Sequence, residues 1–364
     1  MVIFFTILFK MIEEKKKQKI TIKGSMINNC SDPKPTISVI IPVYNGGEKF
    51  QRCLQSLAKT SLNADEVIVV ADGDTDGSWL LAENFGAKVI RLPKAGGPAR
   101  ARNLGAEAAK GDILFFIDAD VEIYPDTIEK VVNVFTNEPD LSALIGSYDD
   151  TPGAENFLSQ YRNLFHHYTH QISQEEASTF WGACGAVRKE VFLHVGGFDE
   201  KYRLPCIEDI ELGYRLKKAG YSIGLRKGIL VKHLKEWRPI SMVKADFFCR
   251  ALPWTALILR DRQLNNDLNL QYSNRMSVVL VYAKIGALLA TPWLSQTSII
   301  ACIFALAFVI LNAPVYQFFH NKRGLFFTLR ALPWHWLYYF YSGLAFGIGF
   351  VRHWFQVQLT YRKA

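Results

Sequence analysis

The sequence predicts an α/β fold with a mainly parallel central sheet, followed by C-terminal transmembrane helices. Between residues 36 and 235, short apolar runs alternate with helix-like segments, which is the pattern of βαβ units. Two of these runs, Ile37–Ile41 and Ile113–Ile117, are apolar on both faces, as central strands covered by helices are. After residue 275 the composition changes, and long apolar stretches suited to a membrane take over.

Strands and helices are expected to alternate along the first part of the chain. The strands are Ile37–Ile41, Val67–Val70, Lys88–Leu92 and Ile113–Ile117, and the helices are Lys49–Ala58, Trp79–Phe85, Pro98–Ala109 and Pro125–Phe135. Ligands of open α/β sheets bind beyond the carboxyl ends of the strands. Residues 42–45, 71–77 and 118–120 should therefore converge on one crevice.

Four regions follow from these patterns. Residues 1–35 form a basic N-terminal segment that we expect to be disordered, and residues 36–235 form the α/β domain. Residues 236–275 mix basic and aromatic side chains, as juxtamembrane interfacial segments do. Residues 276–364 form the expected membrane domain.

The membrane domain contains three apolar stretches, at about 276–294, 298–319 and 334–351. The first two approach the roughly 20 residues that cross a hydrocarbon core, and they predict a membrane hairpin. The third is rich in Tyr and Trp, and it fits a spanning helix or an interfacial one. Basic residues fill the loop before it, so the positive-inside rule places the α/β domain of this multi-pass chain on the cytoplasmic side. They are His320, Lys322, Arg323 and Arg330.

The net charge is +8, from 42 Lys and Arg against 34 Asp and Glu. Much of the excess lies in the N-terminal segment and beside the late apolar stretches, which favours a membrane surface over nucleic acid as partner. The six cysteines include no Cys-x-x-Cys pair, so we expect reduced thiols and no structural zinc.

Acidic residues follow two of the expected strands. Asp118 and Asp120 come directly after a buried strand, and in extended chain their spacing points both carboxylates to one side. Such oxygens suit Mg²⁺ or Mn²⁺, although an Asp pair also starts turns. Asp72 ends the second strand and should face the crevice, whereas Asp76 is expected to cap the next helix.

Three further segments carry candidate site residues. Arg102 lies near a helix start behind two glycines, where it can contact a phosphate or lie on a solvated face. Asp209 shares a helix side with Leu212, while Glu211 is expected on a solvated face, so Asp209 is the expected general base and a helix cap is the alternative. His233 ends an apolar run and can be a metal ligand or an ordinary histidine.

Five motifs occur in a fixed order: Val39–Asn45, Ala101–Asn103, Asp118–Asp120, Gly196–Glu200 and Glu208–Asp209. In order and spacing they resemble family 2 glycosyltransferases, over roughly residues 36–233. The resemblance implies the GT-A fold of nucleotide-diphospho-sugar transferases. It also implies inverting transfer from a nucleotide-sugar to an acceptor hydroxyl.

The resemblance also implies roles for individual residues. The donor nucleotide-sugar would be bound by Pro42, Tyr44, Asn45, Asp72, Arg102 and Asp118. Asp120 and His233 would bind Mg²⁺ or Mn²⁺, and Asp209 would be the catalytic base. Trp181, Gly182 and Glu208 would lie on the acceptor side, although Trp181 can equally fill the core. His166 and His170 are one helical turn apart, and we interpret them as part of an acceptor-side helix.

The sequence departs from the family pattern in two places. The second motif contains Asp72 where a pair of acids is usual, and no Gln-x-x-Arg-Trp motif of processive synthases occurs. The second departure favours transfer of one sugar, and the apolar hairpin favours a lipid or lipid-linked saccharide acceptor, as in envelope polysaccharide or glycolipid biosynthesis. The alternatives are a processive polysaccharide synthase and a catalytically silent GT-A scaffold.

Overall fold

The computed structural model describes residues 34–361, with side chains up to residue 355. The predicted N-terminal segment lies almost wholly outside these described residues. The α/β domain is built on an eight-stranded sheet in the order β3-β2-β1-β4-β7-β6-β8-β5. Its strands are β1 (Ile37–Val43), β2 (Glu66–Asp72), β3 (Lys88–Leu92), β4 (Ile113–Ile117), β5 (Val121–Ile123), β6 (Ala143–Tyr148), β7 (Cys184–Arg188) and β8 (Ile223–His233).

The sheet is mixed. Strands β3, β2, β1 and β4 run parallel, as predicted. From β4 onward the pattern changes, because β7 is antiparallel to both β4 and β6, and β5 is antiparallel to β8. The sequence prediction covered the parallel half and missed this antiparallel continuation.

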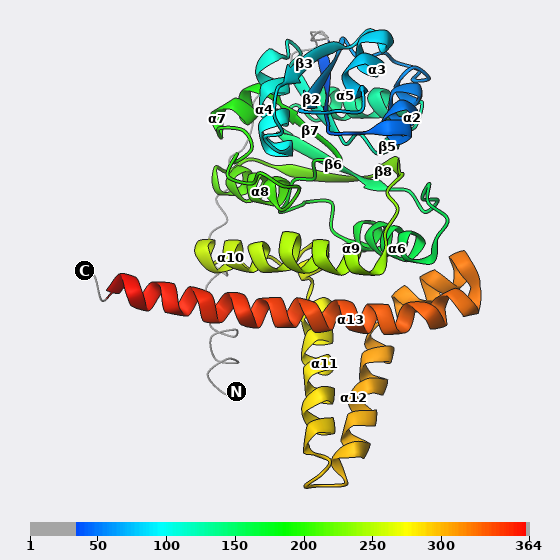
Figure 1. The fold of residues 1–364 in the computed structure, drawn as a ribbon, viewed down its shortest axis with the longest axis vertical. Coiled ribbons are helices and arrows are strands. Elements are labelled where there is room, and N and C mark those ends of the chain that lie inside the picture. Colours follow the sequence, from blue (N-terminus) through cyan, green and yellow to red (C-terminus); the bar gives the residue numbers. More distant parts are fainter. Residues whose placement is uncertain (1–33, 362–364) are drawn as a thin grey trace. The chain divides into compact units, whose positions relative to one another are not determined.

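Helices cover both faces of the sheet (Figure 1). They are α2 (Gly47–Leu57), α3 (Ser78–Phe85), α4 (Pro98–Ala108), α5 (Thr127–Asn137), α6 (Phe157–Ile172), α7 (Lys189–His194) and α8 (Glu208–Lys218). Val39 and Ile41 of β1 pack in the same core as residues of α2 and α5. Ile40, which points to the opposite face, packs with residues of α4, α7 and α8. Strand alternation thus explains why β1 is apolar on both sides.

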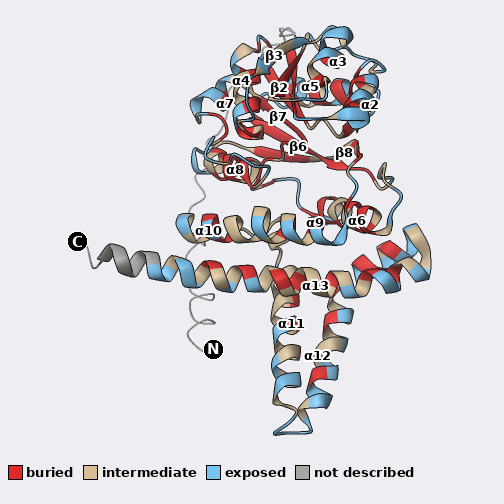
Figure 2. Ribbon diagram, in the orientation of Figure 1, coloured by how far each residue is buried: buried red, intermediate tan, exposed pale blue. Residues whose placement is uncertain are grey.

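A layer of helices follows the α/β domain. It consists of α9 (Pro239–Lys244), the π-helix η1 (Ala245–Ala251), α10 (Leu252–Asp261), the short 3₁₀ turn η2 (Leu268–Leu270), α11 (Tyr272–Ala290), α12 (Thr297–Leu311) and α13 (Ala313–Tyr361). Figure 1 shows α10 and α13 running side by side beneath the sheet, while α11 and α12 form a hairpin that points away from it. In Figure 2 the strands are buried, whereas much of this hairpin is exposed or half-buried.

The helical layer differs from the predicted membrane domain in two respects. The second apolar stretch is not one helix, because α12 ends at Leu311 and the chain bends by 60° before α13. The expected basic loop is also helical, since Lys322 and Arg323 lie within α13, which breaks at Gly324 (φ 80°). Composition predicted the apolar stretches but not these bends.

The third apolar stretch lies within α13, which packs along α10. Tyr341 of α13 donates a hydrogen bond to Asp246 of η1 (2.6 Å), so this stretch is tied to the layer next to the α/β domain. That packing favours the interfacial alternative over a spanning helix. Among residues 34–355, no helix by itself has the length and apolarity of a membrane span, although α12 and α13 meet these criteria as a bent pair.

Candidate active site

The carboxyl ends of β1, β2 and β4 lie at one edge of the sheet, because these strands are parallel neighbours. Pro42 is half-buried within β1, and the loop after β1 carries Tyr44, which is 60% exposed. Asn45 adopts a left-handed conformation (φ 50°), and its Oδ1 accepts a hydrogen bond from the backbone N–H of Thr75 (2.8 Å). The loops after β1 and β2 are therefore joined, as the predicted crevice requires.

Asp72 orders the loop in front of α4. Its Oδ1 accepts from the backbone N–H of Gly96 (2.7 Å) and its Oδ2 from that of Gly97 (2.8 Å). Gly97 has φ 95°, and a Cβ there would lie 2.3 Å from the carbonyl oxygen of Arg203. Sequence reasoning predicted that Asp72 contacts the nucleotide, which stays a prediction, and it missed this role in positioning the glycine loop.

Arg102 lies at the centre of the site. It is 4% exposed and donates to Oδ1 of Asp118 (2.7 Å) and to Oε1 of Glu208 (3.0 Å). Burial opposes its charge, but Asp118 and Glu208 outweigh that effect and raise its pKa above the ordinary value. The guanidinium therefore joins Asp118, of the motif Asp118–Asp120, to Glu208, of the motif Glu208–Asp209. Direct contact of Arg102 with a donor stays a prediction, and the sequence did not predict its role in holding Asp118 and Glu208.

Glu208 and Asp209 open α8 and behave differently. Glu208 is 3% exposed and accepts from both Arg102 and the backbone N–H of Cys206 (2.8 Å), so its carboxylate is fully engaged. Asp209 is half-buried and accepts backbone hydrogen bonds from Gly182 (3.1 Å) and Ile210 (2.8 Å). Burial, and then the charge of Glu208, raise the pKa of Asp209 to about 6. A carboxylate of that basicity accepts a proton near neutral pH.

Two predictions on α8 are resolved by the same contacts. Glu211, expected on a solvated face, is 2% exposed and paired with Arg215 (2.8 Å), so that expectation is wrong. Arg215 is half-buried and also donates to the carbonyl oxygens of Val195 and Gly197. Asp209, predicted as the base, and Gly182, predicted on the acceptor side, are joined by a hydrogen bond.

Asp120 and His233 meet from different strands. Nε2 of His233 lies 3.7 Å from Oδ2 of Asp120, and the His233 ring stacks on Tyr148 with centroids 4.3 Å apart. Burial first, and then the charge of Lys235, lower the pKa of His233 to about 3. The imidazole is therefore neutral, with a ring nitrogen available to a metal. Within the described residues no three His, Cys, Asp or Glu side chains gather as a metal cluster.

An aromatic wall continues from His233. Trp181 is half-buried and its ring lies 4.7 Å from Tyr148, 5.0 Å from His166 and 5.4 Å from His170. Nδ1 of His166 is buried without a hydrogen-bond partner among the described residues. Sequence reasoning placed the two histidines on an acceptor-side helix but missed Tyr148, which no motif marks.

Comparison with known proteins agrees with this geometry. Residues 38–196 match the family model described as glycosyl transferase family 2. This part of the chain is therefore similar to family 2 glycosyltransferase domains. Residues 162–237 also match a model described as the N-terminal domain of galactosyltransferase. These matches support the predicted enzyme class, a glycosyltransferase.

Two curated relatives show how far the similarity extends. The chain is 29% identical over 217 residues to the pre-mycofactocin glycosyltransferase of Mycobacterium tuberculosis, a match that covers 55% of this chain and 44% of that protein. An uncharacterised glycosyltransferase of Escherichia coli, YibD, is 38% identical over 102 residues, or 27% of this chain and 30% of that protein. The chain thus spans less than half the length of these relatives.

A solved structure shares the fold over nearly the whole chain. The mannosyltransferase of Pyrobaculum calidifontis, solved with GDP-Man and Mn²⁺, aligns with a TM-score of 0.55 at 16% identity. The alignment covers 95% of this chain and 94% of that one. The α/β domain therefore has a GT-A-like fold, as the motif resemblance implied.

Proposed function

We propose that this chain is a membrane-attached, metal-dependent, inverting glycosyltransferase. It would move one sugar from a nucleotide-sugar to a hydroxyl of a lipid or lipid-linked saccharide. The observation that carries the proposal is the meeting of distant acids around one cation, Arg102. This residue bonds Asp118 and Glu208 directly, and Asp209 is within its electrostatic reach.

The residues present fit a divalent metal. Asp120 offers a carboxylate oxygen and His233 a neutral ring nitrogen 3.7 Å away, so both can touch one cation. Mg²⁺ and similar ions commonly use one or two protein ligands together with substrate phosphates and water. Two protein ligands are thus compatible with a metal that also binds the donor diphosphate, and the mannosyltransferase of similar fold was solved with both GDP-Man and Mn²⁺. When bound, the metal supplies charge stabilisation of the leaving diphosphate.

Asp209 is the proposed base. Its pKa of about 6 leaves it ionised at neutral pH yet basic enough to take a proton from an attacking hydroxyl. Two backbone N–H groups fix the orientation of its carboxylate. One base on the acceptor side is sufficient for a single displacement, which inverts the anomeric centre without a protein nucleophile.

Membrane attachment is supported by the α11–α12 hairpin. Large apolar side chains on it are exposed, among them Leu289 (68%), Trp293 (81%) and Ile303 (58%). Exposed apolar surface on this scale marks a partner or a membrane. Lys322 and Arg323 of α13 contact the α/β domain at Asp150 and Gln160, so these basic residues and the domain would share one side. The positive-inside rule makes that side cytoplasmic.

A donor screen tests the proposed activity. The full chain in lipid vesicles is incubated with Mn²⁺ and a panel of nucleotide-sugars, and release of the nucleoside diphosphate is measured. We expect release from at least one donor, abolished by chelation and by Asp209→Asn. The matched control is Asp140→Asn, which removes an exposed carboxylate outside the site. Full turnover by Asp209→Asn would overturn the base assignment, and no release from any donor would overturn the proposed function.

A further inference from the structure

Two basic side chains flank a buried tryptophan beside the site. Nζ of Lys235 lies 4.7 Å from the ring centroid of Trp237, and Cζ of Arg250 lies 5.9 Å from it. Trp237 is 5% exposed, so its ring is a fixed surface between the two cations. Lys235 follows β8 and Arg250 belongs to η1, so the pair spans the joint between the α/β domain and the helical layer.

Arg250 is held in place from the helical side. It donates to Oδ1 of Asp246 (3.0 Å), which is 3% exposed. Asp246 also accepts from Arg162 of α6 (2.7 Å) and from Tyr341 of α13 (2.6 Å). The hydrogen bond to Asp246 uses one of the five N–H donors of Arg250. Its guanidinium is 43% exposed, so other donors remain for a ligand.

Lys235 has no carboxylate within salt-bridge distance among the described residues, and its one described polar interaction is with the Trp237 ring. The charges of both cations reach the site, since Lys235 lowers the pKa of His233, and Arg250 lowers the pKa values of His233, His166 and Tyr148. A half-buried lysine without a counter-ion, next to an arginine with free donors, is chemically suited to an anion.

A second observation points to a ligand at the same place. Nδ1 of His166 is buried without a partner, although buried polar atoms of native proteins are almost always hydrogen-bonded. The His166 ring lies in the aromatic wall with Tyr148 and Trp181, within reach of the charge of Arg250. An incoming polar group on this side would satisfy an atom that the described protein leaves unpaired.

We propose that Lys235 and Arg250 form a phosphate-binding subsite for the acceptor, so that the acceptor lipid carries a phosphate group. The inference rests on the proposed function, and it narrows the acceptor class to a phosphorylated amphiphile. Trp237 would hold the two cations in place, and the aromatic wall would face the group that receives the sugar.

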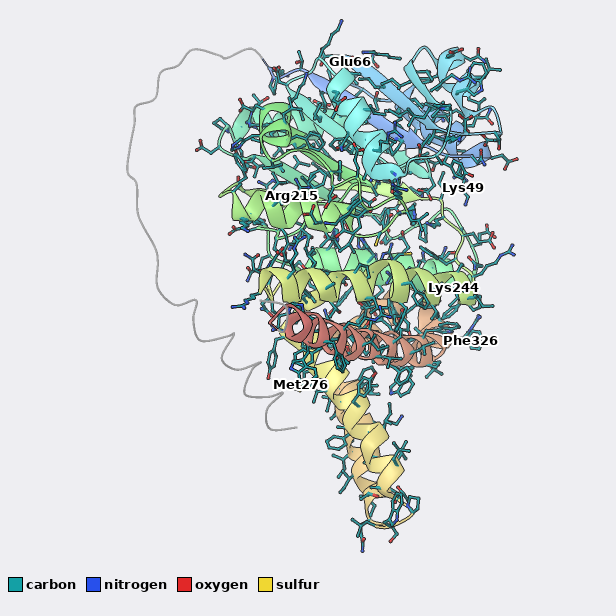
Figure 3. All side chains as sticks on the ribbon, turned by 60° about the vertical axis from the view of Figure 1, so that its left-hand side comes forward. Lys49, Glu66, Arg215, Lys244, Met276 and Phe326 are labelled. Atoms are coloured by element: carbon teal, nitrogen blue, oxygen red, sulfur yellow. The ribbon has the colours of Figure 1, made fainter. Side chains whose placement is uncertain are left out.

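The location favours the acceptor over the donor diphosphate. The donor crevice lies at the carboxyl ends of β1, β2 and β4, where Asp72 and Asp118 are found. Arg250 instead belongs to the layer that carries the apolar hairpin, and through Asp246 it is bonded to α13. Figure 3 shows this layer, marked by Lys244, between the sheet and the point near Met276 where the hairpin begins. A lipid held by the hairpin would present its head group here.

A binding experiment without metal tests the subsite. The full chain in phosphatidylcholine nanodiscs is titrated calorimetrically with dodecyl phosphate and, separately, with dodecanol, which has the same tail and no phosphate. We expect the phosphate to bind at least tenfold tighter than the alcohol, and Lys235→Ala to weaken phosphate binding about tenfold, the scale of one charge-assisted hydrogen bond. Lys235→Arg should restore it. Arg250→Gln is the second variant, with a melting curve to verify folding.

Lys244→Ala is the matched control, because Lys244 is an exposed lysine of the same layer without a described ion pair. If Lys244→Ala weakens binding as much as Lys235→Ala, the effect is general membrane charge and the subsite is overturned. It is also overturned if wild-type protein does not distinguish the phosphate from the alcohol. If Lys235→Ala weakens Mn²⁺-dependent nucleoside diphosphate binding equally, the cations serve the donor and the acceptor assignment fails. The donor screen reports separately on the proposed function.

Discussion

The α/β domain and the α11–α12 hairpin depart from ordinary soluble structure in opposite ways. The domain buries charged groups, each with several partners: Asp72, Arg102, Glu208 and Glu211 are all at most 5% exposed. The hairpin exposes apolar groups, among them Leu289, Trp293, Ile303 and Leu306, each of which is at least 58% exposed. Buried charge is costly unless paired, and apolar surface is costly in water.

The difference indicates what each region binds: the domain a charged ligand, and the hairpin an apolar partner. In the domain, the paired charges fix the positions of Asp118 and Asp209 before any ligand arrives, which is how a preorganised site lowers the barrier to reaction. In the hairpin, nothing in the described chain covers the apolar side chains, so their partner is expected from outside. The predictions below test whether these two roles are separable.

Removing the central guanidinium should have the largest effect. Arg102→Met would leave Asp118 and Glu208 without their shared cation, and breaking a buried ion pair costs about 3–5 kcal/mol of stability. We expect a large loss of stability in urea unfolding and loss of turnover. The control is Arg52→Met, which breaks a surface pair with Glu122 and should cost less than about 1 kcal/mol. Equal effects of the two variants would contradict the central position of Arg102.

The second prediction concerns the pH dependence of Asp209. Its folded-state pKa of about 6 exceeds the ordinary 3.8, so the fold favours the protonated form. The stability from this group is complete below about pH 4 and is lost as pH rises through about 6. At pH 7.5 the free energy of unfolding of Asp209→Asn should therefore exceed that of wild type by about 1–3 kcal/mol, and the difference should vanish near pH 4. Urea unfolding at the two pH values measures it.

The same ionisation should govern the rate. Wild-type kcat/KM should rise with pH and level off above about 6, because the base acts only when ionised. The variant should lose about 10²–10⁴ in kcat, the range typical of a general base. A variant that is less stable than wild type at pH 7.5, or a rate independent of pH between 5 and 7, would argue against this assignment.

The next prediction is that the apolar surface of the α11–α12 hairpin holds the protein on a membrane and takes no part in nucleotide binding. The substitutions Ile303→Lys and Leu306→Lys would place charge on an exposed apolar surface. Each would raise the free energy of insertion into a bilayer by about 2.5–3.5 kcal/mol. We expect the double variant to float poorly with vesicles yet to keep Mn²⁺-dependent nucleotide binding. The control puts lysines at Leu80 and Leu193, exposed leucines of the α/β domain. Unchanged flotation of the hairpin variant would remove the case for membrane insertion.

The sequence predicted the parallel half of the fold and most of the candidate site for physical reasons. Runs such as Ile113–Ile117 are apolar on both faces, and such runs are buried as central strands. The carboxyl ends of parallel strands meet at one edge of the sheet, so the position of Asp118 directly after β4 was enough to predict that it lies at the crevice. Asp120 and His233, both predicted as metal ligands, lie 3.7 Å apart, and metal binding by them stays a prediction.

The remainder depended on contacts that spacing cannot reveal. Arg102 looks like a helix-surface cation, and its burial follows from Glu208, 106 residues away. Tyr148 matches no motif, yet it stacks on His233. The bend after Leu311 lies within an apolar stretch whose hydropathy is continuous, so composition did not predict it. The kink at Gly324 lies in the basic segment that was expected to be a loop and is helical on both sides of that residue.

The central claim is that Asp120 and His233, 113 positions apart in the sequence, serve one cation. A double-mutant cycle tests it through the affinity of a nucleoside diphosphate in the presence and absence of Mn²⁺, measured by calorimetry for wild type, Asp120→Ala, His233→Ala and the double variant. We expect each single variant to lose about 10–100-fold of the Mn²⁺-dependent affinity, and the double variant to lose little more, because the shared cation is already gone. Losses that simply add would show that the two residues act at separate places and would contradict the account.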